Sequence, residues 1–453
     1  MIVFKRKIYN QLLSWKEQSK GSRALLIEGA RRIGKSTIVE EFAKKEYQSY
    51  ILIDFNRASK VVLSAFHNYL NDLDTFFMIL SSEYGVKLYP RESLIVFDEI
   101  QRFPKAREAV KYLVADGRYD YIETGSLISI KENVSDITIP SEERRINMYP
   151  MDFEEFAWAL GGEQLIAYIR QCFEKKSPLN QESHSKAMML FRQYIIVGGM
   201  PQSVVAFIQN GRDFAAADAE KRDILALYRS DMMKIAASYR SGVLAIFDQI
   251  PSFLSKSERR VIMSQIEKGA TFPKYHDTFF WLSDSMIANE CFNCADPNVG
   301  LSLNEDRTYV KCYLGDTGLL ISHTFDENEI ADNELYRQLL FEKLSLNEGM
   351  FFENAIAQTL VAAGHKLYFY THYNEEKHRC DIEIDFLLSN NSKLKYKLYP
   401  VEVKSSDRYS ITSLQRFNEQ FHKRIGGCYV IHPKNLKVEE NITYLPAYMA
   451  FCL

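Results

Sequence analysis

One short stretch, residues 24–37, constrains the fold of this chain more than any other. An apolar run typical of a buried strand, residues 24–27, leads into Gly-x-x-x-x-Gly-Lys-Ser, and an amphipathic run follows up to Lys45. When a glycine loop lies between a strand and a helix in this order, the loop is typical of those that bind the phosphates of a nucleotide. The backbone N–H groups of the loop surround the phosphates, and the start of the helix adds partial positive charge. The predicted nucleotide-binding residues are Gly29, Ala30, Arg31, Arg32, Ile33, Gly34, Lys35, Ser36 and Thr37.

Two side chains of this loop have individual roles in the prediction. Lys35 is placed to reach the β- and γ-phosphates, and the Ser36 hydroxyl is placed to ligate Mg²⁺. The alternative to a nucleotide-binding loop is a glycine turn that precedes a surface helix by chance. The full pattern between a strand and a helix argues against this alternative. We therefore expect ATP or ADP as the ligand and Mg²⁺ as its companion ion.

A second motif lies at residues 93–99, which read Ser-Leu-Ile-Val-Phe-Asp-Glu, a short apolar strand that ends in two acids. Strands of a parallel sheet present their carboxyl ends to one crevice, so this end should face the glycine loop. We expect Asp98 to hold Mg²⁺ and Glu99 to orient and deprotonate the attacking water. The second acid is what a hydrolase needs in addition to a binding site.

Two further strand ends carry candidate catalytic residues. The strand pattern at 119–126 ends in hydroxyl groups, and either Thr124 or Ser126 is a candidate to contact the γ-phosphate or the water, although a simple strand-terminating turn is an equal alternative. Arg144 and Arg145 begin the next strand pattern. One of this pair, with Arg145 the first candidate and Arg144 the other possibility, is expected to neutralise transition-state charge, in its own chain or in a neighbouring copy of a homo-oligomer. Structural salt bridges are the alternative for both arginines.

Size and composition place the chain among ordinary globular proteins with several domains. It has 453 residues, of which 46% are hydrophobic and 25% charged, and a net charge of −3, which argues against a globally basic nucleic-acid binder but not against a local basic face. We expect a cytoplasmic protein with no signal peptide and no membrane span, since the seven cysteines are scattered and no apolar run is long enough. Cys291 and Cys294 form the only tight pair, and buried thiols are favoured over zinc there.

Four motifs together resemble the prokaryotic AAA+ ATPases that carry a C-terminal domain of unknown function, and the resemblance covers nearly the whole chain. They are the glycine loop at 29–36, the acidic strand end at 96–99, Thr-Gly-Ser at 124–126 and Tyr-Pro-Met-Asp-Phe-Glu-Glu-Phe at 149–156. Two positions depart from the family pattern: Ser36-Thr37 replaces a double threonine, and Glu143-Arg144 stands where the family often has a glycine before the arginine near Arg145. The resemblance implies an α/β fold with an AAA+ P-loop parallel-sheet domain at 1–150, a helical lid at 151–238, a winged helix at 239–345 and a restriction-endonuclease-like α/β domain at 346–453.

The resemblance also assigns roles within the two middle segments. In the lid, Gly-Gly-Met-Pro at 198–201 suggests that Pro201 contacts the adenine, whereas the bland interpretation is a helix stop followed by a helix start. A winged helix binds DNA through a recognition helix in the major groove. The candidate helix around Trp281 is aromatic and acidic, so packing against a protein or another domain is an equal alternative to DNA binding.

The last segment carries a second chemical signal, made of acids in the order Glu…Asp…Glu-x-Lys. Glu353 lies on an amphipathic helix at 350–363, Asp385 belongs to a strand pattern at 381–386, and the neighbouring strand at 400–404 places Glu402 and Lys404 on one face. Asp385 and Glu402 are candidate Mg²⁺ ligands and all four are candidate catalytic residues for phosphodiester cleavage, with Lys404 stabilising the developing charge. The order resembles the restriction-endonuclease fold. The alternative is that Lys404 alone neutralises the acids. A basic stripe nearby could track phosphates or be a solvated strand face: Lys393, Lys395, Lys397, Lys404 and Arg408.

These signals lead to two functional hypotheses. The favoured one is an AAA+ ATPase that hydrolyses ATP with Mg²⁺ and acts on, or is regulated by, nucleic acid, with a metal-dependent nuclease site in the C-terminal domain. The alternative is a nucleotide-dependent switch or scaffold whose C-terminal domain is a binding module without catalysis. The substrate, the oligomeric state and the partner do not follow from the sequence.

Overall fold

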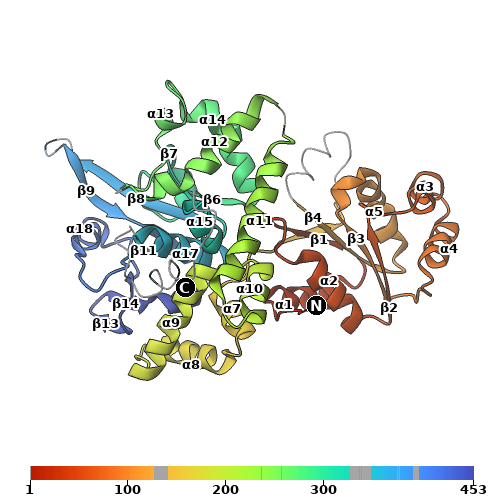
Figure 1. Cartoon of the computed structure of the whole chain (residues 1–453), viewed down its shortest axis with the longest axis horizontal. Coiled ribbons are helices and arrows are strands. Elements are labelled where there is room, and N and C mark those ends of the chain that lie inside the picture. Colours follow the sequence, from red (N-terminus) through yellow and green to blue (C-terminus); the bar gives the residue numbers. More distant parts are fainter. Residues whose placement is uncertain are drawn as a thin grey trace. The chain divides into compact units, whose positions relative to one another are not determined.

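The computed structural model describes residues 2–126, 141–235, 237–256, 258–326, 336, 338, 348–374, 376, 378–390 and 397–453 (Figure 1). Two compact units make up the chain. The first comprises Met1–Tyr149 with Asp284–Met286, and the second comprises Pro150–Ser283 with Ile287–Leu453.

The first unit is built on a five-stranded parallel sheet in the order β2-β3-β4-β1-β5. This confirms the predicted α/β fold with its parallel sheet, and the carboxyl ends of the strands lie at one edge. β1, β3 and β4 are buried along their whole length, which explains their continuous apolar runs. The strands are β1 (Ala24–Glu28), β2 (Ser49–Asp54), β3 (Ser93–Asp98), β4 (Asp120–Gly125) and β5 (Glu143–Asn147).

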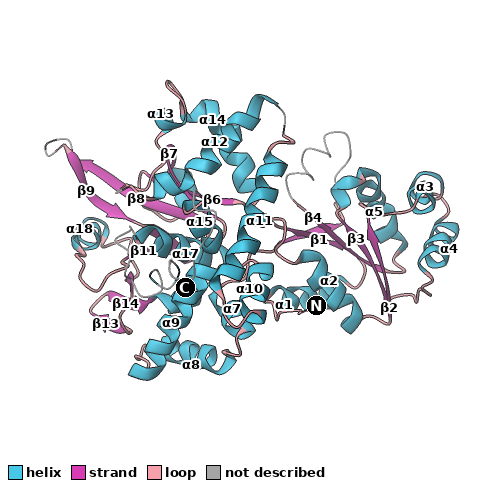
Figure 2. Cartoon of the chain, in the orientation of Figure 1, coloured by secondary structure: helices cyan, strands magenta, loops and turns pink. Residues whose placement is uncertain are grey.

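Helices of the first unit alternate with these strands (Figure 2). The stretch at 58–84, predicted as one helical segment, is two helices, because the chain turns at residues 69–72 and Asp72 caps the second by accepting from the Thr75 N–H. Pro104 occupies the first turn of its helix, where its missing N–H costs nothing. The helices are α1 (Ile8–Ser19), α2 (Lys35–Glu46), α3 (Lys60–Asn68), α4 (Leu73–Tyr84), η1 (Ile100–Arg102) and α5 (Pro104–Asp116).

The second unit opens with consecutive helices. The first is fixed by a capping box, in which Asp152 accepts from the Glu155 N–H and the Glu155 carboxylate accepts from the Asp152 N–H. Gly198 ends one helix with a φ of +79°, and Pro201 begins the next. These helices are α7 (Phe153–Ala159), α8 (Glu163–Glu174), α9 (Gln181–Val197), α10 (Pro201–Gln209) and α11 (Phe214–Met232).

A further group of helices leads into an antiparallel hairpin. β6 (Ala288–Cys294) pairs with β7 (Glu305–Leu314), but β6 also pairs in parallel with β8 (Leu367–Asn374), which pairs with β9 (Arg379–Ile384). One four-stranded sheet therefore contains strands from both sides of residue 345, which itself lies outside the described residues. The helices of this region are α12 (Ala237–Leu254), α13 (Met263–Ile266), α14 (Phe272–Asp284) and α15 (Thr317–Thr324).

A second five-stranded sheet, in the order β10-β11-β12-β14-β13, completes this unit. The strand predicted at 381–386 is interrupted: β9 ends at Ile384, Asp385 is a bend, and β10 begins at Phe386 and pairs with β11 instead of β8. Within the described part of the chain, no helix is both long and apolar enough to cross a bilayer. The remaining elements are α17 (Gly349–Ala362), β10 (Phe386–Asn390), β11 (Lys397–Val403), α18 (Thr412–Phe421), β12 (Cys428–His432), β13 (Lys437–Glu439), β14 (Ile442–Pro446) and η3 (Ala447–Cys452).

Candidate functional site

The glycine loop connects the end of β1 to the start of α2, as predicted. Gly34 precedes α2 with a φ of +93°, a conformation that favours glycine. Gly29 is needed for a different reason, since a Cβ there would lie 2.4 Å from the Met148 carbonyl oxygen. Arg6, a residue that the motif gave no reason to single out, donates to the Ile33 carbonyl at 2.9 Å and to the Tyr149 carbonyl at 2.6 Å. The loop is thus held from outside by the chain that follows β5.

Lys35 is buried inside this loop. Its side chain is only 7% exposed, and its ammonium donates to the carbonyl oxygens of Gly29, at 2.9 Å, and Ala30, at 2.8 Å. Burial lowers the pKa of Lys35 to about 8, against the opposing charges of Glu99 and Asp98. Bound phosphates would supply stronger, charged acceptors for the same ammonium.

Three of the predicted residues meet at one carboxylate oxygen. Asp98, at the end of β3, accepts at Oδ1 from the Ser36 hydroxyl at 2.7 Å and from the Thr124 hydroxyl at the end of β4. A hydroxyl and a carboxylate are oxygen donors of the kind that Mg²⁺ prefers, so Ser36 and Asp98 fit the ion that the motif implies. Ser126 is also buried and follows β4, but Thr124 is the hydroxyl that contacts Asp98.

Glu99 directly follows β3 in an unusual backbone conformation. Its φ of 55° is uncommon for a residue other than glycine. The Glu99 carboxylate is partly exposed and accepts from the Gln101 amide at 2.5 Å. Gln101, a residue outside the predicted motifs, therefore helps to fix the orientation of the predicted base.

The arginine pair has partners within its own chain. Arg145, on β5, is 40% exposed and lies 2.8 Å from Glu143 and 3.9 Å from Glu28. Arg107 of α5 is almost fully buried and forms two hydrogen bonds to the same Glu143 carboxylate, at 3.0 and 3.2 Å. Arg144 donates to the amide oxygen of Gln18 at 3.2 Å. The role of Arg145 as a finger stays a prediction.

This geometry coincides with a family match. Residues 21–157 match a family described as "AAA domain". They form an AAA-type P-loop ATPase domain. Residues 188–329 match a domain of unknown function (DUF8612), and residues 348–449 match another (DUF4143), so neither match assigns an activity to the second unit.

Solved structures similar to this chain are distant. A Walker-type ATPase of Pyrococcus abyssi shares 14% identity over 71% of this chain and 96% of its own length, with a TM-score of 0.39. DnaA of Aquifex aeolicus, bound to AMPPCP, shares 11% identity over 63% of this chain and 90% of its own, with a TM-score of 0.28. No curated protein matches the chain. The assignment of the AAA domain rests on the family match and on the loop geometry.

Pro201, the predicted adenine contact, belongs to the second unit rather than to the AAA domain, and its role stays a prediction. The glycines before it have a packing reason of their own. A Cβ on Gly199 would lie 2.0 Å from the Met151 carbonyl oxygen, and the Gly199 N–H donates to Asp316 at 2.5 Å. Close approach of the Met151 backbone is therefore enough to explain why glycine stands at 199.

Two of the predicted C-terminal acids, Glu353 and Asp385, lie with Glu383 around a lysine that belongs to none of the predicted motifs. Lys311, on β7, is fully buried, and its ammonium is 3.5 Å from Glu353, 3.3 Å from Glu383 and 3.8 Å from Asp385. These three acids are called the acidic cluster below. Glu353 is in addition paired with Arg259 and accepts from the Tyr313 hydroxyl.

Glu402 and Lys404 lie together beside Asp385. The Lys404 ammonium donates to Glu402 Oε1 at 2.6 Å. Asp385 Oδ2, the oxygen that does not face Lys311, accepts from the Val403 N–H at 2.8 Å. Burial raises the pKa of Glu402 to about 7, opposed by Lys404 and reinforced by the charges of Asp385 and Glu383. The structure thus brings the four predicted residues to one region, with Glu353 joined to Asp385 through Lys311.

In the acidic cluster a lysine lies where a metal ion shared by the acids would lie, since the Lys311 ammonium is between Glu353 and Asp385. The Mg²⁺ site expected at Asp385 and Glu402 stays a prediction. Within the described ranges, no group of three or more His, Cys, Asp or Glu residues is arranged to hold a metal. Cys291 and Cys294 are buried thiols on β6, and Lys393 and Lys395 of the basic stripe lie outside the described residues.

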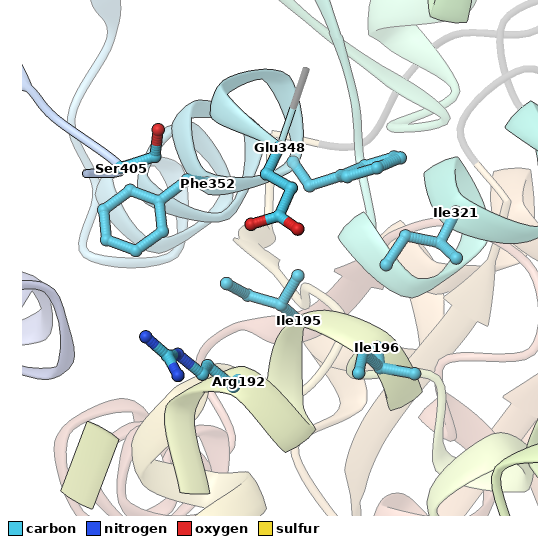
Figure 3. A pocket seen from close by; sticks show the side chains of 8 residues that line it. Arg192, Ile195, Ile196, Ile321, Glu348, Phe352 and Ser405 are labelled. Atoms are coloured by element: carbon cyan, nitrogen blue, oxygen red, sulfur yellow. The ribbon is translucent and has the colours of Figure 1, made fainter. Parts of the chain in front are cut away.

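A small cavity in the second unit has mostly apolar walls (Figure 3). Ile195 and Ile196 of α9 face Phe352 of α17 across it, and Ile321 closes one side. Its volume of about 50 Å³ is far below the roughly 300 Å³ of a small-molecule site. The cavity is therefore too small for a nucleotide.

Proposed function

We propose that the chain hydrolyses ATP with Mg²⁺ at the glycine loop of the AAA domain, and that the bound nucleotide controls what the second unit binds. The observation that carries the first part is the meeting of Ser36 and Thr124 at one oxygen of Asp98. Phosphoryl transfer requires a hydroxyl that ligates the metal, a carboxylate and a further polar group close together. Ser36, Asp98 and Thr124 are these three groups in the proposal.

Each residue has a defined task in this proposal. Lys35 exchanges the carbonyl oxygens of Gly29 and Ala30 for the phosphates, and Ser36 and Asp98 would hold Mg²⁺. The ion would neutralise charge on the phosphate oxygens. Glu99 takes the proton of the attacking water, and Thr124 orients the water or the γ-phosphate. Arg145 supplies charge to the transition state, from its own chain or from a second copy.

The direct test is release of phosphate from ATP by the purified chain. Turnover should require a divalent ion and should be lost in Asp98→Asn, which keeps the size of the side chain but removes the charge that holds the ion. Asp116→Asn, at the far end of α5, is a matched control and should retain activity. If Asp98→Asn hydrolysed ATP at the wild-type rate, the site would lie elsewhere.

For the second unit, the position of Lys311 favours a binding module over a nuclease. A nuclease of the predicted type needs a metal at Asp385 and Glu402, and the ammonium of Lys311 already neutralises Asp385. Plasmid DNA incubated with the chain and Mg²⁺ or Mn²⁺ should therefore stay intact. Nicking that Asp385→Asn abolishes would restore the nuclease hypothesis.

DNA is the first partner to test for this module. The described helices α12, α13 and α14 precede the hairpin β6–β7, which is the order of a winged helix. The comparison is between the ATP state of the chain, held by the Glu99→Gln substitution, and its ADP state. We expect the two states to differ in affinity for a labelled DNA duplex, measured by fluorescence anisotropy. Equal and weak binding in both states would favour a protein partner instead.

A further inference from the structure

We infer that Lys311 is a built-in cation that replaces a metal in the acidic cluster and locks β7 to α17 and to the junction of β9 and β10. The inference concerns the second unit alone, and it can fail without affecting ATP hydrolysis by the AAA domain.

Charge balance is the first argument. Glu353 is fully buried, Asp385 is largely buried and Glu383 is partly exposed, and the three carboxylates surround one point. Arg259 pairs with the other oxygen of Glu353 and contacts neither of the other two acids among the described ion pairs. Like charges this close repel strongly when water is excluded, so the arrangement needs a cation among them. The Lys311 ammonium lies within 4 Å of all three acids and meets that need without an ion from solution.

The surroundings of Lys311 are the second argument. Its side chain has no exposure to solvent, and the ammonium lies 5.1 Å from the centre of the Phe369 ring on β8. An aromatic face attracts a cation and excludes water. Lys311 is therefore enclosed by acids and an aromatic ring, and it cannot swing into solvent to leave the cluster open to a metal.

A second set of contacts, made by two buried amides of α17, fixes the end of β7 and the start of α15 without Lys311. Asn354 of α17 accepts from the Leu314 N–H at 2.9 Å and donates to its carbonyl at 3.1 Å. Gln358, one turn further along α17, accepts from the Thr317 N–H at 2.9 Å and donates to Asp316 at 3.2 Å. These buried amides hold the end of β7 on α17, so replacing Lys311 should leave the local fold in place.

The test is a titration of the full chain with Mn²⁺, in an Asp98→Asn background that removes the predicted metal ligand of the AAA domain. Without nucleotide, this protein should show no stoichiometric Mn²⁺ site by calorimetry or by electron paramagnetic resonance. Adding Lys311→Ala removes the ammonium and leaves space beside the three acids, so one Mn²⁺ per chain should bind. Adding Asp385→Asn as well should abolish that site.

Two results would overturn the inference. One is a Mn²⁺ site in the Asp98→Asn protein that Asp385→Asn removes, because a metal would then occupy the cluster despite Lys311. The other is a folded Lys311→Ala protein that binds no Mn²⁺.

A charge-balanced pair of variants decides the matter if Lys311→Ala does not fold. Lys311→Met should lower the thermal midpoint, and adding Glu383→Gln should recover part of the loss, because one positive and one negative charge are then removed together. A double variant no more stable than Lys311→Met would show that Lys311 does not act by neutralising the cluster.

Discussion

The Ser36 hydroxyl donates to Asp98 Oδ1 at 2.7 Å, across 62 residues of sequence. The sheet order explains the contact, because β4 lies between β1 and β3 and the carboxyl ends of all three strands lie at one edge. The loop after β1 and Asp98 at the end of β3 therefore converge over the end of β4. Predictions about ATP turnover start from this point.

Lys35→Ala should weaken binding of MgATP by about 10-fold or more, that is by at least about 1.4 kcal/mol, because it removes a buried cation from the phosphates. Lys44→Ala is the matched control, since Lys44 lies on the same helix, has a side chain that is 51% exposed and pairs with Glu40. Calorimetric titration with nucleotide compares the two variants. Equal dissociation constants would exclude Lys35 from the site.

Glu99→Gln should keep nucleotide affinity and lower the turnover rate by about 100-fold or more, since the amide spares the neighbouring metal ligand but cannot accept the proton of water. The measurement is steady-state phosphate release together with binding of a fluorescent nucleotide. Glu41→Gln, which removes the partner of Lys45 on α2, serves as control. Turnover at the wild-type rate in Glu99→Gln would mean that another group is the base.

Arg145→Ala should fold, because Glu143 keeps its two hydrogen bonds from Arg107 and a half-exposed ion pair contributes about 1 kcal/mol or less. If Arg145 acts on a neighbouring copy, mixing inactive Arg145→Ala with inactive Lys35→Ala should restore part of the ATPase activity. Each protein then supplies the group that the other lacks. A mixture as inactive as its components would contradict a finger supplied between copies.

The second unit should lose stability as the pH rises from about 5 to 7. Burial raises the pKa of Glu402 to about 7 in the folded chain, against an ordinary 4.5, so the folded state holds a proton that the unfolded state has released. The free energy of unfolding therefore falls with rising pH across this interval. Urea denaturation at pH 5 and pH 8 measures the fall, and Glu402→Gln should reduce it.

Asp407→Asn is the control for this pH dependence, because Asp407 is an exposed acid five residues further along the chain. It should leave the pH dependence of unfolding unchanged. An unaltered pH dependence in Glu402→Gln would show that Glu402 ionises in the folded protein as it does in the unfolded chain.

The nucleotide site was predictable because its signals are local. The glycine loop and the acids at 98 and 99 each lie at a strand end, and one rule about parallel sheets is enough to bring them together. Which hydroxyl contacts Asp98 was not predictable, because Thr124 lies within β4 and Ser126 directly after it, and the end of the strand depends on its pairing. Register depends on strand pairing, which a single sequence does not encode locally.

The acidic cluster shows the opposite situation. Its acids follow a recognisable order, but Lys311 comes from β7, before α17, and lies in no motif with them. The alternation of polar and apolar residues around Asp385 predicts one continuous strand. In the structure the residues before Asp385 pair with β8 and those after it pair with β11, so the segment is divided between two sheets. A long-range contact and a change of strand partner both depend on packing, which overrides the local pattern.

The place of Asp385 at the bend between β9 and β10 has a consequence for tracing ancestry. One oxygen receives the Val403 N–H of the second sheet, and the other faces Lys311 of the first. An aspartate that joins two sheets in this way contributes to folding whether or not the chain cleaves a phosphodiester. Its presence in a sequence is therefore no evidence of cleavage by itself, and a motif search that counts it as such would overestimate how many such proteins are nucleases.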